Sequence, residues 1–143
     1  MEVLQEANIL LNTTLENQED AIRKAGQILV DNGYVNTTYV DKMIEREALT
    51  STYMGNFVAI PHGTEDAKGE VLASGISIIQ APQGVTFDGN EVKLVFGIAG
   101  KNNEHLDILS QIAIVCSEEE NIDKLVNATS KQEIMDMFSE VDA

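Results

Sequence analysis

The chain has 143 residues, of which 43% are hydrophobic, and its nine basic and twenty-four acidic side chains give a formal net charge of −15. This size suits one domain, the charge would repel a phosphate backbone, and no stretch reaches the roughly 20 apolar residues that cross a membrane. We therefore expect a single domain over residues 1–143, with no nucleic-acid partner and no membrane insertion. Since the start also lacks signal-peptide features, we expect the protein in the cytoplasm.

Two helices are predicted in the first third of the chain. Asn17 can cap the first, which should run to about Asp31 because apolar residues recur at helical spacing, with Gly33 as the stop signal. The second is expected over residues 38–47, where it ends in a charged triplet. Arg46, the centre of that triplet, therefore lies at a helix end.

The middle of the chain is read as strands separated by turns. The strands expected are a short buried strand at 57–60, a longer one at 71–80, a brief edge strand at 85–87 and a central strand at 92–99. Residues 81–84 read as a turn or loop, and Asp88-Gly89-Asn90 is a second turn signal.

Three helices are predicted in the last third. One begins at Asn102 or Asn103 and has a single buried face that includes Cys116, the one cysteine, which is expected to act as a small buried hydrophobe. The capping pattern Ser-x-x-Glu at Ser117 and again at Ser130 indicates the starts of two short helices. Helices at both ends with strands between them predict an α/β sandwich, with a mixed parallel and antiparallel sheet of about five strands flanked by helices.

The two histidines are the candidates for chemistry. His62 follows the strand 57–60 in a turn framed by proline and glycine, and His105 follows the strand 92–99 in the first turn of the next helix. Ligand sites in helix-covered sheets gather at strand ends, so we expect the two to meet there. A neutral imidazole can attack phosphorus, and the resulting phosphoramidate is reactive enough to pass the group onward.

A phosphoryl group at His62 would need its charge stabilised. The candidates are the backbone N–H groups after His62, the helix start and imidazole of His105, and the guanidinium of Arg46, none of which requires a metal. On spacing alone, each histidine is also compatible with an ordinary surface residue, and Arg46 with an ion-pair partner of its flanking glutamates. A metal hydrolase that uses both histidines and Asp66 or Asp107 is the other chemistry left open.

Three segments, 43–50, 54–64 and 97–106, resemble the enzyme IIA components of the bacterial phosphoenolpyruvate-dependent sugar phosphotransferase system, in the fructose-mannitol class. They include Pro61-His62-Gly63-Thr64 and Lys101-Asn102-Asn103-Glu104-His105, which look closest to the mannitol-specific branch. In length and element order, the resemblance covers essentially the whole chain.

The resemblance implies that His62 accepts a phosphoryl group from the phosphocarrier protein HPr and donates it to a cysteine of an enzyme IIB domain of a mannitol transporter. It implies no cofactor and no metal, and it places His105 and Arg46 at the phosphoryl group. Partners that bind and leave in each cycle should dock around His62 on an apolar patch with a charged rim. Asn56 departs from a mannitol-type relative with an acidic residue there, which would remove a carboxylate that tunes His62.

Two other functions within the same class remain open. A fructose-specific carrier would use the same chemistry for another sugar. A regulatory module of the nitrogen type would use the phosphohistidine as a signal that controls binding to a target.

Overall fold

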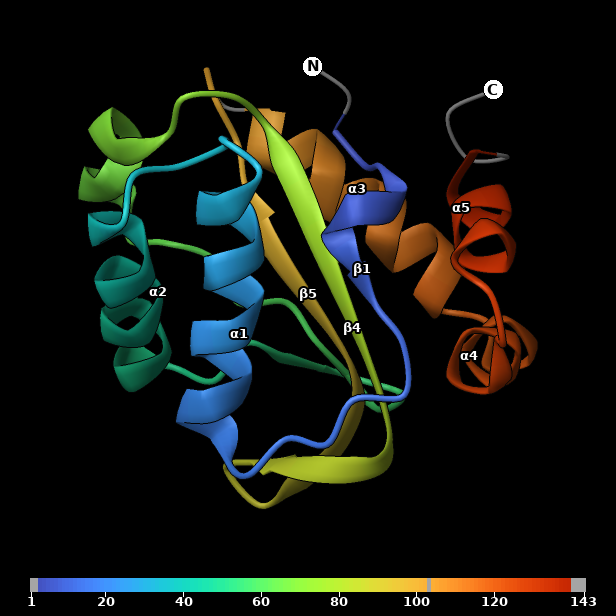
Figure 1. Cartoon of the computed structure of the whole chain (residues 1–143). Helices are drawn as coiled ribbons and strands as arrows, with labels where there is room; N and C mark the ends of the chain where they lie inside the picture. The colour runs from blue at the N-terminus through green and yellow to red at the C-terminus, as the bar shows by residue number, and fades with distance from the viewer. Residues whose placement is uncertain (1–2, 103, 140–143) are drawn as a thin grey trace.

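A mixed five-stranded sheet forms the centre of the fold in the computed structural model, which describes residues 3–102 and 104–139 (Figure 1). The strands in sheet order are β1 (Ile9–Leu10), β4 (Gly75–Phe87), β5 (Asn90–Ala99), β3 (Val58–Ala59) and β2 (Tyr53–Gly55). The pairs β1–β4 and β3–β5 are parallel, whereas β4–β5 and β2–β3 are antiparallel. The predicted α/β architecture with a mixed sheet is confirmed.

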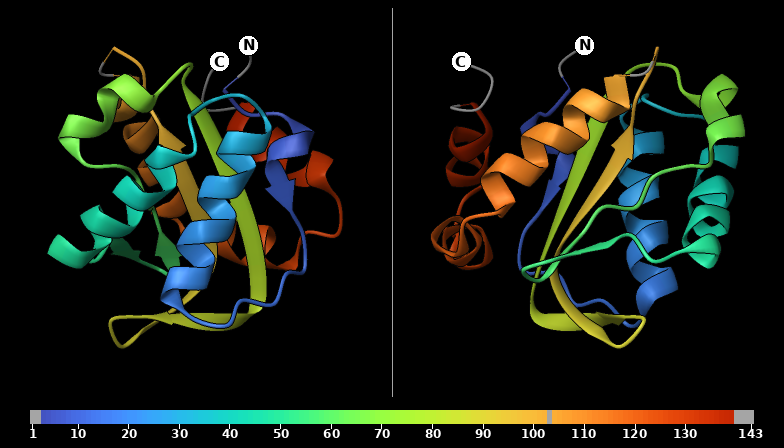
Figure 2. Two further views of the ribbon diagram at one scale, coloured as in Figure 1. Left: turned by 60° about the vertical axis from the view of Figure 1, so that its left-hand side comes forward. Right: turned by 180° about the vertical axis from the view of Figure 1, so that it is seen from behind.

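Helices cover both faces of this sheet (Figures 1 and 2). The helices on one face are α1 (Gln18–Asp31) and α2 (Thr38–Leu49), and those on the other are α3 (Glu104–Cys116), α4 (Glu119–Asn127) and α5 (Lys131–Ser139). Two 3-10 helices, η1 (Glu6–Asn8) and η2 (Glu65–Glu70), lie in the connections. Because both faces are covered, neighbouring strand residues enter different cores: Leu94 packs with the α3 side and Val95 with the α1 side.

The ends of α1 follow the sequence signals. The Asn17 side chain accepts a hydrogen bond from the backbone N–H of Asp20 at 2.8 Å, and Gly33 follows the helix with φ of 83°. Helix α2 extends two residues beyond the predicted end, to Leu49. Arg46 therefore lies in its last turn. Within the described residues, none of the helices combines the length and apolarity that a membrane span requires.

The structure corrects the prediction for residues 71–87. Strand β4 begins at Gly75 and continues to Phe87, so the predicted turn at 81–84 and the separate edge strand after it are wrong. Its pairing with β5 resumes after a register shift between Gln80 and Val85. An irregularity of this kind bends a strand without ending it, and β4 is continuous through its bend (Figure 1). Pro82 lies within the irregular stretch, where its missing N–H is tolerated.

The expected helix starts near the C-terminus are partly corrected. The cap at Ser117 is wrong, because its hydroxyl donates to the carbonyl of Ile114 at 2.9 Å, in the last turn of α3, and α4 begins only after Glu118. The cap at Ser130 is confirmed by a 3.3 Å hydrogen bond from the Glu133 N–H. Helix α3 begins at Glu104. Asn103, one of its two predicted starts, lies outside the described residues.

Candidate active site

Strand pairing brings the two histidines to one edge of the sheet. Strands β3 and β5 are parallel neighbours, so their carboxyl ends coincide. Beyond β3 the chain stays beside β5, where the N–H of Ile98 donates to the carbonyl of Pro61 at 2.9 Å and His62 forms a bridge with Ile98. Beyond β5 the next helix is α3 (Figure 1). It begins at Glu104 and carries His105 in its first turn. The expected meeting of the histidines is confirmed.

A pocket of about 230 Å³ opens at this edge. Its lining includes His62, His105 and Arg46, the three residues selected from the sequence. The other lining residues are Tyr39, Gly63, Thr64, Glu65, Ala67, Lys68, Val71 and Gly100. Residues from α2, the segment after β3, η2 and the β5–α3 connection therefore share one space large enough for a phosphoryl group.

A backbone contact defines which nitrogen of His62 is nucleophilic. Nδ1 lies 2.9 Å from the carbonyl oxygen of Ile60. A carbonyl oxygen only accepts hydrogen bonds, so the proton of the neutral ring is assigned to Nδ1. The unshared electron pair is then on Nε2, the ring nitrogen left to meet a group in the pocket.

The surroundings of His62 favour its neutral form. Burial lowers its pKa below the usual 6.5, and the positive charges of Arg46 and His105 act in the same direction. The hydrogen bond to the Ile60 carbonyl and the negative charge of Glu47 oppose this change without reversing it. The imidazole is therefore uncharged and nucleophilic at neutral pH.

Arg46 is anchored by a neutral group. Its guanidinium donates to the carbonyl of Thr50 at 2.9 Å, and among the described residues it forms no salt bridge with its flanking glutamates. Glu45 instead lies 3.4 Å from Lys42. The surface ion-pair alternative for Arg46 does not hold, and its charge is left to act on a ligand in the pocket.

Glu47 is a buried carboxylate that sequence reasoning missed. It accepts hydrogen bonds from the N–H and hydroxyl of Thr52 at 2.7 and 2.6 Å and from the amide of Gln18 at 3.0 Å. These bonds hold the turn that follows α2, which contains the carbonyl that anchors Arg46. The burial of Glu47 could have been predicted from the sequence, because Tyr39, Met43 and Glu47 are spaced four residues apart on one buried stripe of the helix.

Tyr39 is the second residue that was missed. Its hydroxyl donates to the carbonyl of Ile98 at 2.7 Å and accepts from the N–H of Gly63 at 2.9 Å. The first N–H after His62, one of the groups expected to stabilise a phosphoryl group, is therefore already engaged. Gly63 is required by packing, because a Cβ there would lie 2.6 Å from the Tyr39 ring.

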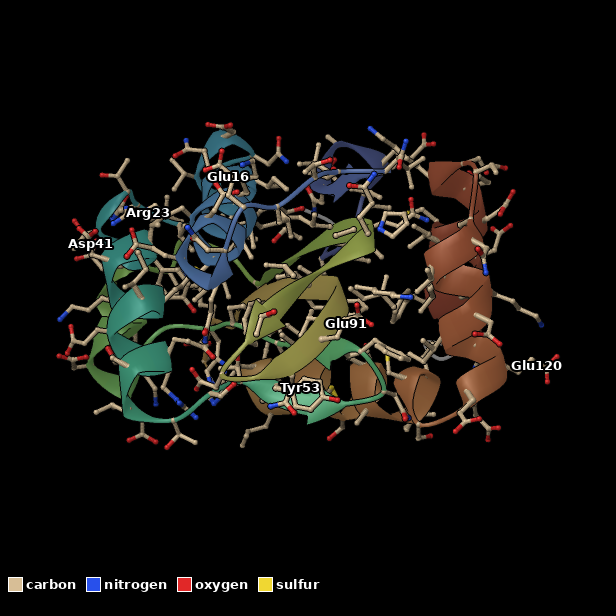
Figure 3. All side chains as sticks on the ribbon, turned by 90° about the horizontal axis from the view of Figure 1, so that it is seen from below. Glu16, Arg23, Asp41, Tyr53, Glu91 and Glu120 are labelled. Carbon is tan, nitrogen blue, oxygen red and sulfur yellow. The ribbon has the colours of Figure 1, made fainter. Side chains whose placement is uncertain are left out.

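The pocket concentrates positive charge in an acidic molecule. Arg46 and Lys68 are two of nine basic side chains, and among the described residues Glu65 is the one acidic residue of the lining. By contrast, acidic side chains such as Asp41 and Glu120 lie on the outer surface (Figure 3). The pocket is thus suited to an anion.

The residues considered for a metal site do not assemble. Asp66 and Asp107 are absent from the pocket lining, and Asp66 accepts from the hydroxyl of Thr64 and lies 3.4 Å from Lys42. In the described part of the chain, no group of three His, Cys, Asp or Glu side chains could share an ion.

Cys116 is buried as expected, and burial raises the pKa of its thiol to about 12.

Asn56 does not belong to the surroundings of His62. It lies in the turn between β2 and β3, is absent from the pocket lining, and donates to the carbonyl of Cys116 at 3.1 Å. The expectation that this position supplies or withholds a carboxylate beside His62 is therefore wrong. The carboxylate whose charge reaches His62 is that of Glu47.

Comparison with known proteins identifies the family. The family model described as "Phosphoenolpyruvate-dependent sugar phosphotransferase system, EIIA 2" matches residues 2–141. The chain belongs to this family. It is thus an enzyme IIA component of a sugar phosphotransferase system, and its activity is phosphoryl transfer.

Individual enzyme IIA components support the predicted branch. The mannitol-specific phosphotransferase enzyme IIA component of Bacillus subtilis (strain 168) is 63% identical over 142 residues, covering 99% of each chain. That of Geobacillus stearothermophilus is 65% identical and covers 99% of this chain and 98% of its own. The resemblance to the mannitol branch is confirmed.

A solved structure has the same fold. It is the complex of enzyme IIAMTL and phosphorylated enzyme IIBMTL from Escherichia coli, which matches with a TM-score of 0.90 and 38% identity, covering 96% of this chain and 97% of that one. The enzyme IIA fold is therefore shared over nearly the whole length.

Proposed function

We propose that this enzyme IIA component carries phosphoryl groups for mannitol uptake, with His62 as the carrier. Phosphorylated HPr is the donor, and a cysteine in the enzyme IIB domain of a mannitol transporter is the acceptor. The observation that carries the proposal is the Nδ1 contact with Ile60, which leaves Nε2 of His62 unprotonated in a pocket lined by cationic side chains. The relatives named as mannitol-specific support the choice of sugar.

The chemistry at His62 requires no proton transfer. The electron pair of Nε2 forms a nitrogen–phosphorus bond while the corresponding bond in the donor breaks. Positive charge that develops on the ring is stabilised by the Ile60 carbonyl, which already accepts the Nδ1 proton. When the cysteine thiolate attacks, a sulfur–phosphorus bond forms, the bond to Nε2 breaks, and its electron pair returns to the ring.

Two groups stabilise the transferred phosphoryl group in this proposal. Arg46 donates charge-assisted hydrogen bonds to its oxygens from the last turn of α2. His105 approaches it from the first turn of α3, where the helix dipole also favours an anion. Because the group is dianionic, removal of either residue should slow transfer and leave His62 in place.

The partner surface that we propose surrounds the pocket. Leu49, Leu72 and Leu106 are each at least half exposed, and each lies within three residues of a pocket-lining residue. Exposed apolar side chains beside a small charged site suit partners that bind and leave in each cycle. The net charge of −15 favours partners with basic surfaces around their own reactive groups.

A reconstituted relay tests this function. With enzyme I, HPr and phosphoenolpyruvate, we expect one acid-labile phosphoryl group per chain, absent in His62→Ala. His105→Ala and Arg46→Ala should fold and become labelled more slowly. Full labelling of His62→Ala would refute the carrier assignment, and wild-type rates in the other two would refute their roles.

Transfer to enzyme IIB distinguishes the carrier from a regulatory module. Addition of a mannitol-type IIB domain should remove the label from His62, and a fructose-type domain should remove it much more slowly. Label that stays on His62 with both domains, together with phosphorylation-dependent capture of a regulator, would contradict the carrier.

The same proposal includes a single type-2 enzyme IIA domain over residues 1–143 and a cytoplasmic location. Limited proteolysis tests the single domain, and cell fractionation tests the location.

A further inference from the structure

We infer that Tyr39 is a positioning residue for phosphoryl transfer, whose hydroxyl holds the turn that carries His62 against the end of β5. The inference rests on the proposed role of His62 as the carrier. It assigns to Tyr39 a contribution to the transfer rate that is separate from its contribution to stability.

The hydroxyl of Tyr39 adds a side-chain link between the turn of His62 and the end of β5, two segments that are also joined by a backbone bridge. Tyr39 is buried in the first part of α2, where its oxygen donates to the Ile98 carbonyl at 2.7 Å and accepts from the Gly63 N–H at 2.9 Å. Ile98 also donates its own N–H to the carbonyl of Pro61 at 2.9 Å. Ile98 thus holds the turn at Pro61 directly and at Gly63 through Tyr39, on both sides of His62.

The aromatic ring contributes separately from the hydroxyl. A Cβ at Gly63 would lie 2.6 Å from Cε1 of Tyr39, so the ring packs directly against this glycine. Burial raises the pKa of the Tyr39 hydroxyl to about 12, so it remains protonated and neutral around pH 7. Its proton is directed to Ile98. Tyr39 therefore acts through the position of His62 and does not donate to the phosphoryl group.

The same contact relates the two histidines to each other. Two residues after Ile98, the chain turns at Gly100, where a Cβ would overlap the backbone nitrogen of His105. The end of β5 therefore determines where His105 begins α3, and Tyr39 ties the turn of His62 to that same end. Displacement of a reacting group by about 1 Å can cost roughly 100-fold in rate, so loss of this link should slow transfer even in a folded protein.

The decisive variant is Tyr39→Phe, which keeps the ring and removes the hydroxyl. Tyr34→Phe is the matched control, because Tyr34 is also buried and its hydroxyl accepts two hydrogen bonds, from Gln5 and Asn8, each at 3.0 Å. Tyr34 does not line the pocket. Both variants should lose a few degrees of melting temperature, about 2–6 °C, for the lost hydrogen bonds.

Three measurements separate positioning from stability. In single-turnover transfer from phosphorylated HPr, Tyr39→Phe should be about tenfold slower than wild type, and Tyr34→Phe should match wild type. In nitrogen NMR of the imidazole, the Nδ1-protonated tautomer of His62 should be less populated in Tyr39→Phe and unchanged in Tyr34→Phe. The Gly63 amide of the wild type should be protected from hydrogen exchange.

Each outcome is decisive for this inference. A wild-type rate in Tyr39→Phe, equal slowing in Tyr34→Phe, or an unprotected Gly63 amide would overturn it. Failure of the wild type to become labelled on His62 would instead refute the proposed function. The tautomer and exchange measurements need no phosphoryl donor, so they test the positioning of His62 independently.

Discussion

Glu47 offers a sharp test of how the site is supported, through the pair Glu47→Leu and Glu47→Gln. Leucine would leave the N–H and hydroxyl of Thr52 without an acceptor in a site where Thr52 is 5% exposed. An unsatisfied buried group costs about 1–3 kcal/mol, and bonds to a charged acceptor contribute about 1.5–3 kcal/mol each, so we expect a loss of about 3 kcal/mol. Glutamine keeps one acceptor oxygen, and the Thr52 hydroxyl can turn to accept a hydrogen bond from the new amide. The loss of stability in Glu47→Gln should therefore be about 1 kcal/mol.

Urea denaturation followed by circular dichroism measures these losses directly. At about 3 °C per kcal/mol for a chain of this size, the melting temperature should fall by about 9 °C in Glu47→Leu and about 3 °C in Glu47→Gln. Transfer should slow in the leucine variant to the level of Arg46→Ala, since the turn that anchors Arg46 is released. Glu45→Leu is the matched control, and its exposed pair with Lys42 should contribute at most about 0.5 kcal/mol.

The result that would refute this reasoning is a Glu47→Leu variant within about 1 kcal/mol of wild type. That outcome would mean that the turn after α2 is held without the carboxylate. A stability loss with an unchanged transfer rate would separate Glu47 from Arg46.

Three further predictions concern the pocket and its rim. The pKa of His62 in NMR titration should lie below 6.5, so half of the labelling rate should be lost only at a pH below 6.5, and a pKa above 6.5 would contradict this. Arg46→Met should raise the pKa of His62 by removing a positive charge. Gly100→Ala should displace the start of α3 and slow transfer about tenfold in a protein that still folds. A wild-type transfer rate in this variant would contradict the prediction. Leu106→Asp should weaken HPr binding about tenfold by calorimetry. The control is Ile114→Asp, which should not weaken binding, because Ile114 lies on the same helix away from the pocket and is 62% exposed, compared with 60% for Leu106. Equal effects of the two substitutions would reject the docking surface.

The long elements that sequence reasoning found have enough residues to show a period, whereas β3, which has two residues, was found from its short apolar run. Helices α1 and α3 span 14 and 13 residues, and β5 spans 10, so their apolar patterns repeat. Strands β1 and β2 have two and three residues, too few for any pattern, and they exist because β4 and β3 offer them partners. The break predicted at 81–84 failed because β5 pairs with β4 on both sides of it.

The sequence by itself determined the chemistry, because the residue types and their local setting are written in it. His62 stands at the end of an apolar strand in a turn framed by Pro61 and Gly63, and the segments around it carry the family resemblance. The same local reading placed Arg46 at a helix end and His105 at a helix start.

Only the tertiary structure decided how these groups act on one another. The parallel pairing of β3 and β5 brings His62 and His105 together, and the packing of α2 adds Arg46, Tyr39 and Glu47. The physical reason is that hydrogen bonds and charges act over a few ångströms, whereas these residues are separated by up to 66 positions in the chain, from Tyr39 to His105. Which nitrogen of His62 reacts, and what holds it in place, therefore follows from the fold.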